Sequence, residues 1–344
     1  MEPNQSCRPE SRQLLASLTT AKFLLDSYIP SLVVIGGVVG NTIAVVIMAK
    51  PKHRRTTTGF YLTVIGVLDN VELVTYWGDS YLPILVRNSP AIQSDVWCKA
   101  WNFANVSQFG VLSWLVVLFS VERFYITYFP LRPRIFTLKR VRLLAALAFA
   151  LGCATRAPYL TLTYYDQALG RCHWHVNALA SATNNLVFGL SYVHAGTLVA
   201  LNSLMAVKIA HSAKARARVS NQRVVDADSV RVTVSLQIVA WAFALIPLPW
   251  FVFHAFVSQY DEPAVVLFCD PEFGALAIAF GYSLTLTLAL TNHATNFWIY
   301  FVAFKGFRAD LAALFGRARH LPSKGERPAT LTNSAVSTSA GIFG

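Results

Sequence analysis

Long apolar runs recur along the whole chain, and they constrain its fold more than any other feature. Each run is long enough to cross the roughly 30 Å hydrocarbon core of a bilayer as a helix. The second and fourth runs also hold charged residues, which blur their ends. The runs comprise residues 27–49, 58–86, 103–121, 143–164, 178–207, 232–259 and 273–304. We therefore expect an all-α membrane protein built as a seven-transmembrane helix bundle.

The composition and the distribution of charge support this fold. Only 13% of the residues are charged, whereas soluble domains carry about 25%. A net charge of +12 would suit a nucleic-acid-binding protein, but most Lys and Arg residues cluster in alternate connections between the runs. This alternation follows the positive-inside rule and argues against a nucleic-acid partner. It predicts a multi-pass plasma-membrane protein with an extracellular N-terminus, a cytoplasmic C-terminus and basic loops that contact lipid.

The chain divides into four predicted segments, of which only the helical bundle is a domain. The first run is expected to act as its own targeting signal, because residues 1–20 lack the apolar core of a signal peptide. Asn4 begins a glycosylation sequon in the outside tail. The segments are an extracellular tail (1–23), the transmembrane domain (24–303), an amphipathic membrane-surface helix (304–319) and a disordered cytoplasmic tail (320–344).

Four of the five cysteines fall on the outside face of this topology, which is oxidising. Pairing Cys98 with Cys172 would join the third run to the loop before the fifth. Pairing Cys7 with Cys269 would tie the tail to the last outside loop. We expect both bridges, and we expect Cys153, which lies within the fourth run, to be a small buried residue.

Acidic residues within the second run are candidates for function, because charges are costly in a membrane. Asp69 is expected in a pocket filled with water and ions, and Asp79 lies nearer the outside, where a ligand could reach it. For Glu72 two interpretations stay open, since it could serve function or merely hold helices together. In the structural interpretation, these acidic residues form hydrogen bonds with Asn41, Asn292 and Asn296 and hold the helices together.

Further polar and aromatic residues in the runs are candidate ligand contacts, although helix packing explains such residues equally well. The candidates are Asn105, Gln108 and Phe109 in the third run, with Trp250 and His254 in the sixth. No pair of His or Cys residues has metal-ligand spacing within the bundle, so we expect no metal site. Pro247 and Pro249 each remove a backbone donor and predict a weak point in the sixth helix.

Several short motifs, in order and at consistent spacing, carry a family resemblance. They are Gly40-Asn41, Leu68-Asp69, the Cys98 and Cys172 pair, Glu122-Arg123-Phe124, Asn296-Phe297-Trp298-Ile299-Tyr300, and Phe307-Arg308. Over residues 24–316 the chain resembles the rhodopsin-like (class A) G protein-coupled receptors. Within them it is somewhat similar to the invertebrate neuropeptide receptors.

The resemblance implies a signalling receptor and no enzyme. Arg123 would reach toward a heterotrimeric G protein on activation and Tyr300 would support it. The same switch would include Glu122, Phe124, Pro249 and Asn296. A sodium ion, framed by Asp69, Asn292 and Asn296, is the one bound ion that the resemblance implies. Arrestins and receptor kinases are further implied partners.

Departures from the family pattern change what is expected of the seventh helix, the sixth helix and the ligand. Phe297 replaces a proline, so the seventh helix should be straighter there, and Pro247 stands where a tryptophan is usual. Asn105 stands where amine receptors carry an aspartate, which disfavours an amine ligand. Residues 273–304 contain no lysine, which excludes retinal on a Schiff base.

The expected class of ligand is inferred from the charge of the outside segments. Outside segments are rich in acidic residues, which would attract a basic or amidated peptide, although such acids also serve solubility and topology. We expect a neuropeptide ligand. A lipid or another small molecule on the same fold is the alternative. A transporter or channel is less well supported, because the sequence shows no internal repeat.

Overall fold

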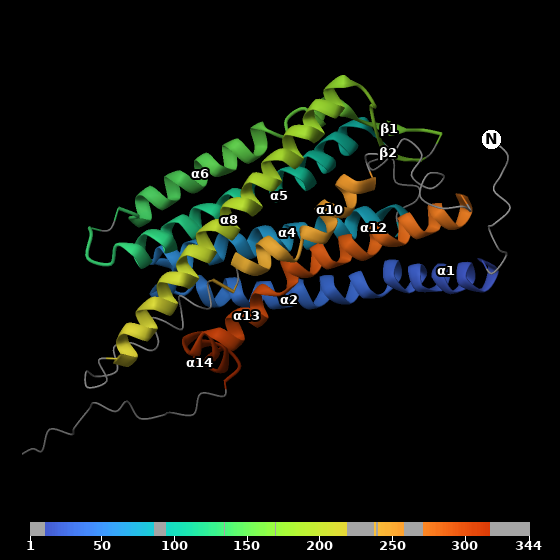
Figure 1. Ribbon diagram of the computed structural model, residues 1–344. Helices are drawn as coiled ribbons and strands as arrows, with labels where there is room; N and C mark the ends of the chain where they lie inside the picture. The colour runs from blue at the N-terminus through green and yellow to red at the C-terminus, as the bar shows by residue number, and fades with distance from the viewer. Residues whose placement is uncertain are drawn as a thin grey trace, which may run out of the picture.

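The computed structural model describes residues 11–85, 94–133, 135–168, 170–218, 237–238, 240–257 and 271–316. Long helices lie side by side in one elongated bundle, with the hairpin β1–β2 at one end and α14 at the other (Figure 1). The helices are α1 (Ser11–Ser27), α2 (Ile29–Met48), α3 (Pro51–Arg54), α4 (Thr57–Leu85), α5 (Asp95–Tyr128), α6 (Leu138–Ala154), α7 (Tyr159–Leu162), α8 (Ala178–Arg218), α10 (Leu248–Val257), α12 (Pro271–Ala294), α13 (Asn296–Ala303) and α14 (Lys305–Leu314). The strands are β1 (Thr163–Asp166) and β2 (Arg171–Trp174).

Six helical segments among the described residues are long and apolar enough to cross a membrane. Helix α4 is not one of them, because Asp69, Glu72 and Asp79 interrupt its apolar sequence. It is nevertheless 29 residues long and packs against α2 and α5 inside the bundle. With α4 the bundle has the seven spans that the sequence predicts.

The first span begins earlier than predicted. Helix α1 covers Ser11–Ser27, which includes part of the predicted tail, and the apolar stretch extends over Gln13–Met48. Its sequence holds five leucines and two alanines, residues with a high helix propensity.

The sixth and seventh spans are both interrupted. Ile246 and Pro247 form a bend before α10, as expected for a proline that removes a backbone donor. The seventh span breaks at Thr295, where Figure 1 shows α13 leaving the axis of α12. The prediction of a straighter helix there is therefore wrong. The Thr295 hydroxyl donates to the Asn292 carbonyl at 3.0 Å, a local bond that bends helices even where proline is absent.

Helices α5 and α6 approach closely through Gly152. A Cβ added there would lie 2.6 Å from Val111 Cγ2 and 2.8 Å from the Val111 backbone nitrogen. Because backbone cannot move aside as a side chain can, we expect Gly152→Ala to destabilise the purified protein by about 1–3 kcal/mol, measured as a lower unfolding temperature. Gly189 in α8 is the matched control, since its added methyl would meet nothing within 4 Å. An equal loss of stability in both variants would contradict this packing argument.

At the opposite end from the hairpin, α14 is fastened to α3, the short helix between α2 and α4. Asp310 accepts bonds from Lys52 Nζ at 2.8 Å and His53 Nε2 at 2.8 Å. Burial alone would raise the pKa of Asp310, but the bonds from His53 and Lys52 outweigh it, so the pKa is lowered. Buried Phe307 packs its ring against Tyr300 at 6.0 Å. The helix lies within the predicted surface-helix range and holds the base of the seventh span.

The hairpin β1–β2 is joined to the other end of α5. Cys98 and Cys172 form the predicted disulfide, with their Cα atoms 5.5 Å apart. Two hydrogen bonds reinforce it, from Tyr165 N to Asp95 Oδ1 at 2.7 Å and from Asn102 Nδ2 to Thr163 Oγ1 at 2.7 Å. Cys153 is free and partly buried. Cys7 and Cys269, like Asn4, lie outside the described residues, so the second bridge and the glycan stay predictions.

Candidate functional site

The centre of the bundle holds a buried polar cluster around Asp69 of α4. Asp69 Oδ1 is 2.8 Å from His293 Nδ1, and Asp69 Oδ2 accepts a bond of 2.5 Å from Asn296 Nδ2. Asn41 of α2 donates to the His293 carbonyl oxygen at 2.8 Å. Asn292 is equally buried, but its side-chain atoms have no hydrogen-bond partner among the described residues. The cluster ties α2, α4, α12 and α13 together at the break in the seventh span.

These residues fit a sodium ion poorly. Both oxygens of Asp69 already accept hydrogen bonds, and an imidazole N–H directed at the carboxylate would face any cation bound there. Sequence reading gave His293 no role in this pocket. The imidazole takes the position beside the carboxylate that an ion would need. The sodium ion expected from the sequence is tested by the following measurement, for which this geometry predicts no sodium response.

We expect the unfolding temperature of the wild-type protein to stay the same when sodium chloride is replaced by choline chloride. His293→Ser removes the competing ring and supplies a hydroxyl oxygen, so this variant should gain a stabilising response to sodium. The variant Asp69→Asn/His293→Ser is the control, because without the carboxylate the response should disappear. A sodium response already present in the wild-type protein would contradict the fit argument.

One turn along α4, Glu72 faces α5. Gln108 Nε2 donates to Glu72 Oε2 at 2.6 Å and contacts Thr75 Oγ1 at 2.8 Å. The bond to Gln108 favours the interpretation in which Glu72 holds helices together. The sequence had suggested asparagines as its partners, and the structure shows a glutamine. Gln108 is buried in the same contact. It therefore bridges two helices and does not face the cavity described below.

The acid–arginine pair lies at the α14 end of α5. Arg123 Nη2 is 2.5 Å from Glu122 Oε1, and Thr57 Oγ1 of α4 donates to the same oxygen at 2.5 Å. The Arg123 guanidinium also lies 5.3 Å from the centre of the Phe119 ring. Phe124 stacks on Tyr128 at 4.4 Å. A charged group is thus held by one ion pair at the edge of the bundle, where a partner can compete for it.

Tyr300 of α13 connects this end to the central cluster. Its side chain is buried, and its hydroxyl has no hydrogen-bond partner in the described part of the chain. It packs between Phe304 and Phe307, with ring centroids at 5.9 and 6.0 Å. An unpaired buried hydroxyl is costly and favours a second arrangement in which it is bonded.

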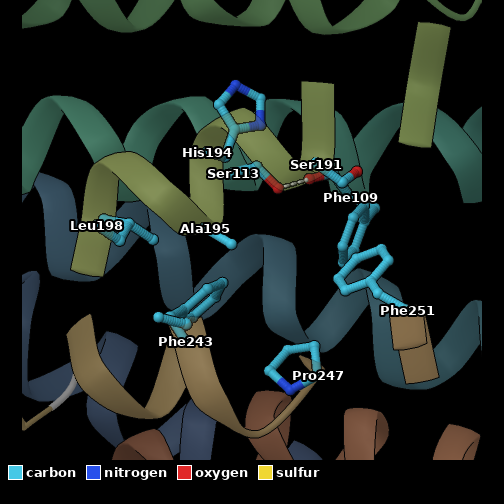
Figure 2. A pocket seen from close by; sticks show the side chains of 10 residues that line it. Phe109, Ser113, Ser191, His194, Ala195, Leu198, Phe243, Pro247 and Phe251 are labelled. Carbon is cyan, nitrogen blue, oxygen red and sulfur yellow. Dashed lines mark hydrogen bonds between the residues drawn. The ribbon is translucent and has the colours of Figure 1, made fainter. Parts of the chain in front are cut away.

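Nearer the disulfide end, a cavity of about 30 Å³ lies between α5, α8 and the sixth span. Figure 2 shows the rings of Phe109 and Phe251 beside each other at its edge, with centroids 6.1 Å apart. Its lining comprises Phe109, Ser113, Ser191, His194, Ala195, Leu198, Phe243, Ala244, Pro247 and Phe251. The bend at Pro247 therefore lies directly at the cavity wall.

An aromatic cluster continues from this cavity toward the disulfide end. His254 stacks on Phe188 of α8 at 4.4 Å and lies 5.6 Å from Trp250. Trp250 in turn meets Tyr282 of α12 at 5.6 Å. The structure thus brings the predicted residues Phe109, Trp250 and His254 into one aromatic region.

Comparison with known proteins identifies the architecture. A family model described as 7 transmembrane receptor (rhodopsin family) matches residues 40–300. The chain is a rhodopsin-family G protein-coupled receptor. The human growth hormone secretagogue receptor type 1 is 24% identical over 303 residues, which is 81% of this chain and 77% of that protein. The human motilin receptor is 31% identical over 136 residues (39% and 32%), and the mouse KiSS-1 receptor 28% over 127 residues (37% and 32%).

Three further predicted site residues of this receptor are not among those that line the cavity. Asn105 lies one turn from Phe109 on α5 and is partly buried. The side chain of Asp79 lies outside the described residues. Pro249 is exposed in the first turn of α10, whereas the bend itself falls at Ile246 and Pro247.

Sequence reading missed several residues that the receptor places around the cavity, among them Phe188, His194 and Tyr282. Isolated aromatic residues in an apolar helix give no signal of which face they occupy. His194 did give one, since it is a titratable residue within a membrane span.

Proposed function

We propose that this receptor binds an extracellular peptide and activates a heterotrimeric G protein. The aromatic cavity between α5, α8 and the sixth span supports this most directly, because the Pro247 bend lies in its wall. Pressure on that wall would move the part of the sixth span beyond the bend. The family membership supports the coupling, and relatives that are receptors for peptide hormones support the ligand class.

The orientation of the proposed receptor follows from its two ends. The end with the Cys98–Cys172 disulfide would face the oxidising exterior, and the end with Arg123 and the basic residues of α3 and α14 would face the cytoplasm. Binding would occur at the first end and G protein coupling at the second. Arrestins and receptor kinases would act on the same cytoplasmic end.

A ligand screen in cells that report several G protein outputs tests this function. We expect basic or amidated peptides to elicit a response, and we expect Phe251→Ala to weaken it by removing the ring opposite Phe109. Val252→Ala is the matched control, because Val252 is an exposed neighbour on the same helix. A response to a lipid or nucleotide panel, with none to peptides, would overturn the proposed ligand class.

A further inference from the structure

We propose that Arg156 binds a small monovalent anion inside the bundle, between α5, α6 and α8. Arg156 follows α6 by two residues and is only 1% exposed. Its Nη1 donates to Thr155 Oγ1 at 2.6 Å. Its Nε and Nη2 atoms have no hydrogen-bond partner among the described residues. Two donor groups of one charged side chain are thus buried without a partner in this part of the chain.

The guanidinium lies about midway along the bundle, within the predicted fourth span. It packs on Gly110 of α5, where an added Cβ would be 2.2 Å from Arg156 Cζ. Gly110 is twelve residues from Cys98, or about 18 Å along the helix, and it lies roughly half-way to Arg123. The absence of a side chain at Gly110 is therefore what allows the arginine to lie at this depth.

A charge at this depth needs a counter-charge. An arginine at the bilayer centre costs about 3 kcal/mol by insertion scales, and such residues normally pair with a partner of opposite sign. The ion pairs of the described residues do not include Arg156. Its one side-chain hydrogen bond among the described residues, to the neutral Thr155 hydroxyl, supplies no such charge. The missing interaction is one with negative charge.

The neighbouring polar atoms are also suited to an anion. His194 of α8 is 4% exposed, and neither of its ring nitrogens has a hydrogen-bond partner in the described part of the chain. The His194 ring meets the Trp114 ring at 4.4 Å, and Trp114 Nε1 is also an unpaired donor among these residues. Nitrogen atoms of two further side chains, on α5 and α8, are thus buried and unpaired among the described residues.

Close packing around the guanidinium limits the size of the occupant, since not even a Cβ would fit between Gly110 and Arg156. The cavity of about 30 Å³ has His194 in its lining but not Arg156 (Figure 2). The proposed occupant is therefore small, a single halide or the end of one carboxylate. The shared chemistry is one negative charge that accepts several N–H bonds. Its source is either chloride in solution or a carboxylate group.

Thermal unfolding of the purified receptor in detergent tests the site, without agonist or G protein. We expect chloride at about 150 mM to raise the unfolding temperature by about 3 °C over gluconate, which is too large to enter. Arg156→Gln should abolish this difference. Arg142→Gln is the matched control, because Arg142 is an exposed arginine of α6, and it should keep the difference. Acetate in a third buffer distinguishes a carboxylate from a halide.

A direct binding measurement covers the case in which Arg156→Gln does not fold. Radioactive chloride should bind the wild-type receptor, and excess bromide should displace it. Stabilisation by acetate alone would assign the site to a carboxylate. No stabilisation by either anion, together with no chloride binding, would overturn the proposal. Since no signalling is measured, that result would leave the proposed receptor function untouched.

Discussion

Replacing Arg123 with alanine is expected to abolish agonist-dependent nucleotide exchange on the G protein. The guanidinium is held by one ion pair with Glu122, at the end of α5 where we propose that the G protein binds. Charge-assisted hydrogen bonds to a partner are worth about 1.5–3 kcal/mol each, so losing them should lower exchange by about tenfold or more. Binding of a radiolabelled GTP analogue in membranes measures the effect.

Two companion variants separate coupling from folding. Arg123→Ala alone leaves the buried Glu122 carboxylate without its cation, which is destabilising by itself. The double variant Glu122→Gln/Arg123→Ala removes both charges, and it should recover surface expression while exchange stays absent. Glu122→Gln alone releases Arg123 and should raise exchange without agonist. Normal exchange in the double variant would show that Arg123 has no part in coupling.

Replacing Cys172 with serine is expected to cause the largest loss of stability. The bridge to Cys98 closes a loop with a sequence separation of 74, for which the chain-entropy argument gives about 4 kcal/mol. Cys172 is the better choice of the two, because it is partly exposed while Cys98 is fully buried. Thermal unfolding under non-reducing conditions and peptide binding at the cell surface measure the loss.

Two controls test whether the bridge itself is responsible. Cys153→Ser changes a free, partly buried cysteine and should have a much smaller effect. In the Cys172→Ser background, Cys98→Ala should add little, since the shared bond is already gone. Additive losses from the two cysteines would show that each acts through its own packing.

The sequence motifs predicted much of the bundle, and particular residues show which contacts they did not predict. Asp69 and Asn296 were expected together, and they are bonded, because both stand at motif positions that resemble one family. His293 was not expected beside them, since nothing in an apolar run tells which neighbour a ring will meet. Thr295 breaks the seventh span through a side-chain bond that propensity does not reveal.

Arg156 illustrates the same limit. The sequence shows an arginine in an apolar run, and its cost in lipid marks it as unusual. Its burial depends on Gly110 of α5, against which the guanidinium packs and which is far away in the chain.

By itself the sequence determined the helical bundle, its basic end, the disulfide between Cys98 and Cys172, and the receptor family. The length of the apolar runs, the positions of the charges and the order of the motifs are properties of the sequence itself, so they need no knowledge of contacts between helices. Only the tertiary structure decided which polar groups are satisfied. Hydrogen bonding and burial depend on contacts between helices, and the rotation of each helix about its axis sets those contacts.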